Sequence, residues 1–118
     1  MNSSLVERFA VEWIAAWNAH DIQRVLTLYA DDFEMSSPLI IQVAGESSGR
    51  LRGKAAVAAY WNKALQIHPG LELELLEVFT GVASVVLYYR GARGRLAAEV
   101  FLFDENQLVS RAFAHHGS

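Results

Sequence analysis

The sequence predicts an α+β fold with three helices in its first part and a mostly antiparallel sheet in its second part. Apolar residues recur every three or four positions up to residue 29 and again over residues 54–67, and over residues 71–75 they alternate with polar ones ahead of further strand-like segments. The chain has 118 residues, of which 53% are hydrophobic and 19% are charged. We see no internal repeat and no linker, so we expect one domain, residues 1–118, around a single core.

Two helices joined as a hairpin are expected at the start of the chain. Ser4 and Glu7 stand three residues apart ahead of an apolar run, which is the capping-box pattern of a helix start. This helix is predicted to end near Asn18, and Asp21 is expected to cap the second helix. The side chains predicted to be buried on the two helices are Val6, Phe9, Ala10, Trp13, Ala16, Trp17, Ile22, Val25, Leu26 and Tyr29.

The middle of the chain is predicted to hold a short strand, a loop and a third helix. Residues 33–36 alternate like a strand, and Pro38 is expected to end it because proline cannot continue a ladder. Residues 44–50 are rich in turn-forming residues, which is typical of a mobile loop. The third helix is predicted over residues 54–67, with a buried stripe that consists of Val57, Tyr60, Trp61, Ala64 and Leu65.

Four strands are predicted to follow the third helix. They are expected within residues 71–80, 82–89, 95–103 and 107–116, separated by glycine-rich or polar turns. The alternation in the first of these strands changes parity at Leu76, which predicts a β-bulge near residues 75–76.

The last two strands are predicted to have two apolar faces. By alternation, one face carries Ala97, Glu99, Phe101, Phe103, Val109, Arg111, Phe113 and His115. The opposite face carries Leu96, Ala98, Val100, Leu102, Leu108, Ser110, Ala112 and Ala114. Helices can cover only one face, so we expect a second copy of the chain to cover the smoother one and form a homodimer through the outer sheet face.

Three polar residues on the first of these faces form the candidate catalytic group. A three-residue turn over 104–106 sets Glu99 opposite Arg111 with His115 further along, whereas a turn two residues longer keeps the faces and changes the pairing. In one interpretation Glu99 and Arg111 are only a structural salt bridge. In the other, all three line a cavity, where Glu99 or His115 is an acid or base and Arg111 stabilises an anion.

The composition argues against several other classes of protein. The chain has no cysteine for disulfides or thiolate ligands, and its net charge of -3 argues against a general nucleic-acid binder. The adjacent His115 and His116 point to opposite faces of a strand and no third ligand is nearby, so we expect no metal. We also expect no cofactor. No apolar run approaches the ~20 residues of a membrane span and no export signal is visible, so we expect no membrane association and a cytoplasmic location. Arg90, Arg93 and Arg95 are interpreted as an exposed turn rather than a phosphate site.

Four segments of the chain resemble the NTF2-like superfamily. They are residues 13–21 (Trp-Ile-Ala-Ala-Trp-Asn-Ala-His-Asp), residues 28–33 (Leu-Tyr-Ala-Asp-Asp-Phe), Pro38, and residues 49–53 (Gly-Arg-Leu-Arg-Gly). The resemblance covers essentially the whole chain and is closest to the SnoaL-like and ketosteroid-isomerase-like branch, with His20 at a position where the motif has glycine. It implies a cone-shaped α+β barrel of the cystatin-like kind, in which a curved sheet wraps three helices around a deep apolar pocket. It also implies dimers through the outer sheet face.

The resemblance carries over only part of the isomerase's catalytic machinery. The general base of that enzyme corresponds to Ser37, its oxyanion-hole tyrosine to Trp13, and its second oxyanion donor to Glu99. A serine cannot act as that base, so we do not expect steroid isomerisation by that mechanism. Epoxide-hydrolase relatives use an Asp/Arg/Asp cluster that Glu99 and Arg111 match in part. Polyketide-cyclase relatives use a histidine and an aspartate in the cavity, and here the histidine would be His115.

An inward-facing aromatic set in such a cone suits a flat apolar ligand. We expect a small hydrophobic molecule to be bound there or transformed by cofactor-independent acid/base chemistry of the isomerase, cyclase or hydrolase type. The alternative is a non-catalytic ligand-binding or dimerisation module whose aromatic residues fill the core. The side chains predicted to line the pocket are Trp13, Trp17, Tyr29, Phe33, Met35, Ser37, Tyr60, Trp61, Phe101 and Phe113.

Overall fold

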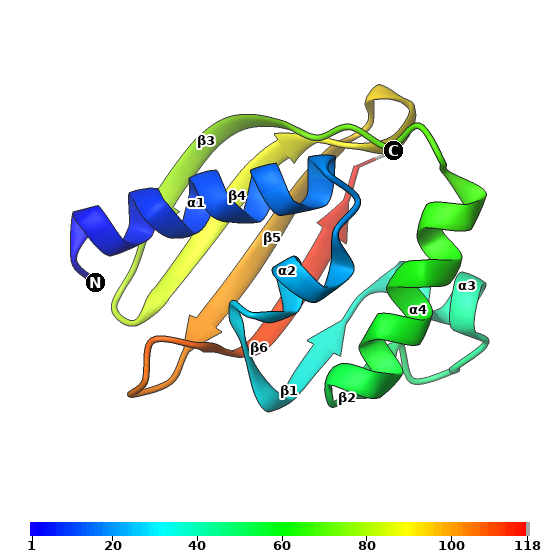
Figure 1. Ribbon diagram of the computed structural model, residues 1–118, viewed down its shortest axis with the longest axis horizontal. Helices are drawn as coiled ribbons and strands as arrows, with labels where there is room; N and C mark the ends of the chain where they lie inside the picture. The colour runs from blue at the N-terminus through cyan, green and yellow to red at the C-terminus, as the bar shows by residue number, and fades with distance from the viewer. Residues whose placement is uncertain (118) are drawn as a thin grey trace.

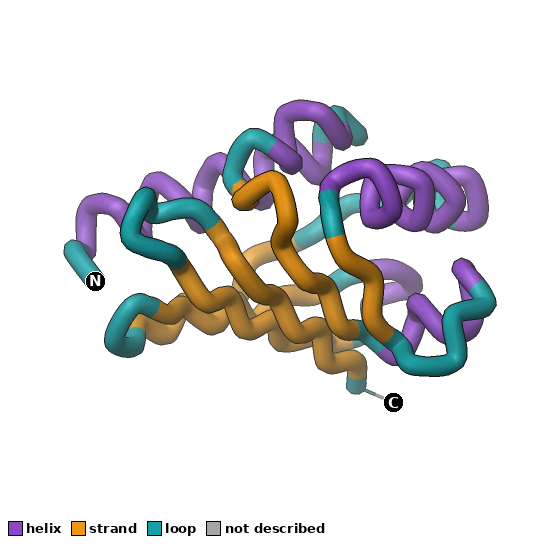
Figure 2. Tube along the Cα trace, turned by 90° about the horizontal axis from the view of Figure 1, so that it is seen from below, coloured by secondary structure: helices purple, strands orange, loops and turns teal. Residues whose placement is uncertain are grey.

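A curved sheet with the longer helices on one side forms the body of the protein, whose computed structural model describes residues 1–117 (Figures 1 and 2). Over these residues the sheet has six strands, in the order β2-β1-β6-β5-β4-β3. We call the side that faces α1 and α4 the inner face and the opposite side the outer face. The predicted α+β class and the curved, mostly antiparallel sheet are confirmed. Within residues 1–117 no helix is long and apolar enough to cross a membrane.

The first two helices form the expected hairpin. Helix α1 spans Ser3–Asn18 and α2 spans Ile22–Leu26. The prediction that Ser4 caps α1 was wrong, because the side chain of Asn2 accepts a hydrogen bond from the Ser4 backbone N–H at 2.8 Å and starts the helix earlier. Asp21 caps α2 as predicted, since its carboxylate accepts a hydrogen bond from the Arg24 N–H at 3.1 Å.

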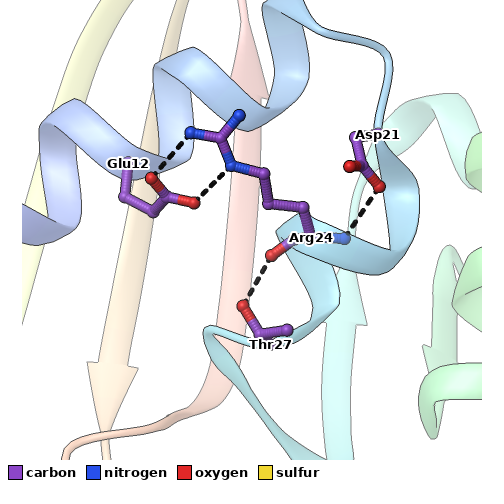
Figure 3. A network of polar contacts seen from close by, with 4 residues as sticks. All are labelled: Glu12, Asp21, Arg24 and Thr27. Atoms are coloured by element: carbon purple, nitrogen blue, oxygen red, sulfur yellow. Dashed lines mark hydrogen bonds and ion pairs between the residues drawn. The ribbon is translucent and has the colours of Figure 1, made fainter.

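An ion pair between Glu12 and Arg24 joins the two helices (Figure 3). The guanidinium of Arg24 donates from Nε to Glu12 Oε2 at 2.6 Å and from Nη2 to Oε1 at 2.9 Å, which is the two-pronged geometry that suits these groups. These hydrogen bonds lower the pKa of Glu12. Thr27 donates its hydroxyl to the Arg24 carbonyl at 2.6 Å and closes the last turn of α2. The hairpin is therefore held by directional bonds as well as by its buried stripe.

The segment after the hairpin differs from the prediction in two places. Strand β1 spans Tyr29–Ser36, so Tyr29 belongs to the strand rather than to the second helix, although it is buried as expected. Pro38 ends β1 but also starts a short helix that was not predicted, α3, Pro38–Ala44. Proline suits the first turn of a helix because it has no N–H to leave unpaired there, and Ser37 caps the helix by accepting from the Leu39 N–H at 3.1 Å.

The remaining elements agree with the predicted order, apart from the short strand β2, Arg50–Arg52, which was not predicted. Helix α4 spans Lys54–Ile67. The other strands are β3 Glu74–Thr80, β4 Ser84–Arg90, β5 Leu96–Phe103 and β6 Val109–His116, with a short 3-10 turn, η1, at Ala92–Gly94. The register of β3 against β4 shifts between Leu75 and Glu77, which confirms the predicted bulge. Neighbouring strands are antiparallel except β1 and β6, which run parallel.

A second β-bulge, in β6, overturns the predicted pairing of the last two strands. Phe103 pairs with Val109, whereas the neighbouring Leu102 pairs with Arg111, so Ser110 is an extra residue in the ladder. The Ser110 hydroxyl donates to the Leu102 carbonyl at 3.2 Å. From Arg111 onward the bulge reverses which side chains of β6 face inward.

The predicted faces are therefore right for β5 and wrong for most of β6. Glu99 is paired with Ala114 rather than with Arg111. The inner face carries the buried Ala97, Glu99, Phe101, Ala112 and Ala114. The outer face carries Val86, Tyr88, Ala98, Val100, Leu102, Arg111, Phe113 and His115. The outer face is thus less smooth than the alanine- and serine-rich surface that alternation predicted.

The end of α1 is bonded to the segment that leads into β3. Asn18 acts as a strand partner for Leu73, donating from Nδ2 to its carbonyl at 3.0 Å and accepting from its N–H at Oδ1 at 2.7 Å. His20 adopts the left-handed φ of 56° that glycine favours, which explains glycine at this motif position. Its Nε2 lies 2.7 Å from the Leu71 carbonyl, so a hydrogen bond offsets the backbone strain.

Replacing Asn18 with alanine should destabilise the protein, because both hydrogen bonds to Leu73 would be lost. The half-buried backbone N–H of Leu73 would then have no partner. We expect a loss of about 1–3 kcal/mol in the free energy of unfolding, measured by urea denaturation. Asn62→Ala on the exposed side of α4 is the control and should change stability much less. Equal effects of the two substitutions would contradict this role of Asn18.

Candidate functional site

A cavity of about 420 Å³ lies between the inner face of the sheet and the helices. Its lining comes from α1, α3, α4, the segment before β3, the turn between β4 and β5, and the inner faces of β1, β4, β5 and β6. The residues from the helices and β1 are Trp13, Trp17, Met35, Ser37, Leu39, Gln42, Val43, Tyr60, Trp61, Ala64 and Ile67. The other lining residues are His68, Leu71, Leu73, Tyr89, Gly91, Ala92, Arg93, Arg95, Ala97, Glu99, Ala114 and His116.

Small side chains from the strands leave this space open. Ala97 and Ala114 line the cavity next to Glu99. Ala97 lies two residues before Glu99 on β5, and Ala114 is paired with Glu99 on β6. The bulge at Ser110 places Ala114 inside and the bulky Phe113 outside. A phenylalanine at an inner position of β6 would occupy part of the space that the alanine leaves free.

Three tryptophans form the aromatic wall of the cavity. The rings of Trp13 and Trp17 are 6.3 Å apart and those of Trp17 and Trp61 are 5.0 Å apart, all in edge-to-face arrangements. The indole N–H of Trp13 donates to the Tyr29 hydroxyl at 2.9 Å, which fixes the ring. Trp13 also packs against Tyr89 at 5.3 Å, so the wall continues from α1 onto the sheet.

Among the described residues 1–117, Glu99 has the one carboxyl group that lines this cavity, and only 4% of the residue is exposed to solvent. The Tyr89 hydroxyl donates to Glu99 Oε1 at 3.1 Å. No Lys, Arg or His side chain among residues 1–117 lies within salt-bridge distance of Glu99. Burial without a counter-charge disfavours the carboxylate, and it raises the pKa of Glu99 to about 7 despite the Tyr89 hydrogen bond.

Tyrosines surround this carboxyl group and stay protonated. Burial raises the pKa of Tyr60 to about 12 and that of Tyr29 and Tyr89 well above the usual value, and the charge of Glu99 contributes to each increase. Near neutral pH the site thus holds neutral phenols beside a carboxyl group that can be either protonated or ionised. A group whose pKa lies near the working pH is suited to give or take a proton.

The structure places the sequence-predicted pocket residues in three different locations. Trp13, Trp17, Met35, Ser37, Tyr60 and Trp61 line the cavity. Tyr29, Phe33 and Phe101 are fully buried in the core and do not line it. Phe113 lies on the outer face because of the bulge, so its predicted inward orientation was wrong.

Two of the three predicted catalytic side chains lie on the outer face, away from Glu99. Arg111 Nη2 lies 3.7 Å from Glu34 Oε1, and its guanidinium carbon lies 5.0 Å from the centre of the Phe113 ring. His115 is exposed and its Nδ1 lies 3.2 Å from the Phe113 carbonyl. The prediction that Arg111 and His115 share a face with Glu99 was wrong, and Glu99 and Arg111 form no salt bridge.

The sequence reasoning missed several residues of this site. Tyr89 could have been found by extending the alternation of β4, where Val85, Leu87 and Tyr89 are all buried. His116, rather than His115, lines the cavity. The charge of Arg111 was the signal for this, because an inner position would have buried that charge. His115 lies on the same face of the strand as Arg111 and therefore faces outward with it. Arg93 and Arg95 also line the cavity, although their turn is exposed as predicted.

The three positions that correspond to isomerase catalytic residues have different roles here. The Ser37 hydroxyl caps α3, and the Trp13 indole N–H is bonded to Tyr29. Glu99 alone has the protonation behaviour that an acid or base requires.

The sheet wrapped over its helices, with a cavity between them, is the cystatin-like fold. Residues 10–109 match the SnoaL-like domain, and the chain belongs to this family. The resemblance seen in residues 13–21, 28–33 and 49–53 is thereby confirmed. No curated protein sequence matches the chain.

Solved structures agree with this assignment. A SnoaL-like protein of unknown function from Burkholderia thailandensis is 52% identical, over 99% of this chain and 98% of that chain, with a TM-score of 0.95. A protein of unknown function with a cystatin-like fold from Methylobium petroleophilum is 17% identical, over 100% of this chain and 79% of that chain, with a TM-score of 0.78. TerC, co-crystallised with polyporic acid, is 15% identical, over 96% and 92% of the two chains, with a TM-score of 0.79. The last two similarities show the fold alone.

Glu99 should make the stability of the protein depend on pH. Its pKa is raised from the ordinary value of 4.5 to about 7, so the folded protein binds a proton at Glu99 more tightly than the unfolded chain does. Stability should therefore be greatest below about pH 4.5 and fall by up to about 3 kcal/mol as the pH rises through about 7.

Glu99→Gln should remove this dependence, because glutamine keeps the shape of the side chain and cannot ionise. Urea denaturation from about pH 5 to pH 8 should show the variant more stable than the wild type at the higher pH only. Glu105→Gln, in the exposed turn after β5, is the control and should retain the slope. Parallel stability curves for the wild type and Glu99→Gln would rule out a raised pKa at Glu99.

Proposed function

We propose that the protein binds a small hydrophobic molecule in the cavity and that Glu99 transfers a proton to or from it without a cofactor. The observation that carries this proposal is the buried carboxyl group of Glu99, without a counter-charge among residues 1–117, at the wall of an otherwise mostly apolar cavity. Such a group is expensive for stability, because burial removes its carboxylate from water and raises its pKa to about 7. Perturbed groups of this kind in cavities are typical of functional sites.

The shape and lining of the cavity support a flat apolar ligand. A volume of about 420 Å³ falls in the range of small-molecule sites, which is about 300–1,000 Å³. The edges and faces of Trp13, Trp17 and Trp61 offer contacts to an aromatic or polycyclic body. The Tyr60 hydroxyl and the Glu99 carboxyl group offer polar contacts that would orient it.

The arrangement favours proton transfer at a carbon or oxygen of the ligand. As a carboxylate, Glu99 would accept a proton, and as a carboxylic acid it would donate one. Tyr89 donates to Glu99 Oε1 and would keep that oxygen oriented during both steps. Isomerisation, cyclisation and hydration all need such a transfer, and one protein of similar fold is named a putative isomerase of the SnoaL-like family. Arg111 and His115 have no part in the proposal because they lie on the outer face.

Binding can be tested with a panel of hydrophobic ketones, lactones and acids in thermal-shift measurements. A ligand raises the melting temperature by mass action, so hits identify the chemical class. Ala114→Leu should abolish these shifts because the larger side chain fills the cavity beside Glu99, at a residue that is now 8% exposed. Ala55→Leu, on the exposed side of α4, is the control and should bind like the wild type. If the Ala114→Leu variant still binds the hits, the ligand binds outside this cavity.

Proton transfer can be tested on ketone hits by following the exchange of their α-hydrogens for deuterium in D₂O by NMR. The wild type should accelerate exchange, with a rate that rises through about pH 7 as Glu99 ionises. Glu99→Gln should lower the enzymatic rate by about 100-fold or more and leave ligand affinity within a few-fold. Binding without any acceleration by the wild type would favour the alternative, a non-catalytic binding protein.

We also propose that two copies of the chain associate through the outer face. Val86, Val100 and Phe113 form a row across β4, β5 and β6 and remain partly exposed. Tyr88 and Leu102 extend this apolar surface to either side. The helices cover the opposite face, so a second copy is the simplest cover for this one.

Light scattering coupled to gel filtration tests this association. The wild type should elute as a dimer and Val100→Lys as a monomer, because the lysine places a charge at the centre of the contact. Val82→Lys is the matched control, since Val82 is 93% exposed in the turn between β3 and β4 and outside this row. A monomeric wild type at all concentrations would overturn this proposal.

A further inference from the structure

We propose that the ligand is an amphipathic carboxylic acid, whose apolar body occupies the cavity and whose carboxylate is bound by Arg93 and Arg95 at the opening. This inference rests on the proposed function and names the class of molecule that the same site selects. Three observations support it: the position of the opening, the charges around it, and the ion pairs and hydrogen bonds of the two arginines.

The cavity opens between two loops. A second hollow of about 450 Å³ adjoins the first and shares six lining residues with it, namely Ile67, His68, Leu71, Gly91, Ala92 and Arg93. Its other lining residues, Pro69, Gly70, Glu72 and Gly94, are all exposed, so it lies on the solvent side of the cavity. These residues come from the connection between α4 and β3 and from the turn between β4 and β5. A ligand that fills the inner cavity would therefore have one end between these two loops.

Two arginines lie at this end. Arg93 and Arg95 line the inner cavity together with His68 and His116, whereas Glu99 is its single acidic residue among residues 1–117. Glu72, in the outer hollow, is the other carboxylate nearby. The chain as a whole has a net charge of -3, so the basic character of the opening is local. Its field also acts on His116, whose pKa is lowered by burial and by the charges of Arg95 and His115.

The two arginines are available for an anion. Within residues 1–117 neither of them has a carboxylate within salt-bridge distance, whereas Arg24, Arg90 and Arg111 each have one. Arg95 donates from Nη2 to the Gly117 carbonyl at 2.7 Å, which uses one of its donors and fixes its position. The planar fork of an arginine matches the two oxygens of a carboxylate.

The backbone of the turn presents Arg93 in an unusual conformation. Its φ of 58° lies in the left-handed region, and it stands directly before Gly94, whose φ is 70°. Hydrogen bonds from the Gly94 N–H to the Gly91 carbonyl at 3.1 Å and from the Arg95 N–H to the Ala92 carbonyl at 3.1 Å hold the turn in this shape. A non-glycine residue in this region is costly, and the turn keeps an arginine there, beside the opening.

The polarity of the site then assigns the two ends of the ligand. The aromatic wall formed by Trp13, Trp17 and Trp61 takes the apolar body, and the opening takes the charge. Glu99 lines the inner cavity with the tyrosines Tyr60 and Tyr89, where it would face a hydroxyl or carbonyl group of the body. An acid with its charge at the Glu99 end would instead meet a second carboxyl group.

Matched pairs of probes test the inference. Benzoate, 2-naphthoate and biphenyl-4-carboxylate would each be compared with the corresponding primary amide, which keeps the apolar body and removes the charge. Dissociation constants would be measured by quenching of tryptophan fluorescence and by calorimetry, at low and high salt. We expect the best acid to bind the wild type at least about tenfold more tightly than its amide, with an advantage that salt reduces.

Variants of the opening separate charge from shape. Arg93→Gln and Arg95→Gln should each remove most of the advantage of the acid and leave amide binding within about twofold. Arg8→Gln, on the exposed side of α1, changes the net charge equally and should behave like the wild type. Both opening residues are exposed, and urea denaturation verifies that the variants fold.

The outcomes also distinguish this inference from the proposed function. Equal binding of acid and amide, or an acid affinity that neither opening variant changes, would overturn the inference while leaving a hydrophobic site in place. If neither acid nor amide binds the wild type and Ala114→Leu makes no difference, the proposed function itself fails. A salt-sensitive preference for the acid that only the opening variants abolish supports both.

Discussion

The orientation of β6 depends on a single β-bulge, and the contents of the inner face follow from it. A regular ladder that included Ser110 would turn Arg111, Phe113 and His115 toward the helices. The bulge takes up this residue, and the Ser110 hydroxyl bonds the Leu102 carbonyl where the ladder is interrupted. Small side chains then face Trp13 and its neighbours across an open space, and the charged and bulky ones face outward. The cavity thus owes its existence to the register of the sheet more than to the helices above it.

The inner face contains one group that the core would be more stable without. Glu99 could be replaced by an apolar residue of similar size at no cost in hydrogen bonds except the one from Tyr89. Its environment instead keeps it uncharged for part of the time near neutral pH, and phenols that do not ionise surround it. Stability is reduced at the same position where the cavity gains a group able to exchange a proton. Such opposition between folding and chemistry is common at functional sites.

Periodicity and turn chemistry predicted most of the fold, because these signals are local. The stripe of α1, the cap at Asp21, the bulge near Leu75 and the succession of the last four strands could all be predicted from local sequence patterns. The site was predicted less well, because it depends on which strand residue faces which side over a long range. A bulge of one residue has no strong local signature, and it separated Glu99 from Arg111 and His115. Helix α3 was missed for a different reason, since Pro38 was interpreted only as the end of a strand.

The bonds at the end of α1 determine how the rim of the cavity can move. Asn18 and His20 attach residues 71–73 to the helix through side-chain hydrogen bonds, so that side of the rim moves only if the helix end moves with it. The facing turn is bonded within itself and, through Arg95, to Gly117 near the end of the chain. A molecule wider than the gap would thus enter by displacing residues 91–94, and admission of ligands would be governed by the stiffness of that turn and by the bond from Arg95 to Gly117.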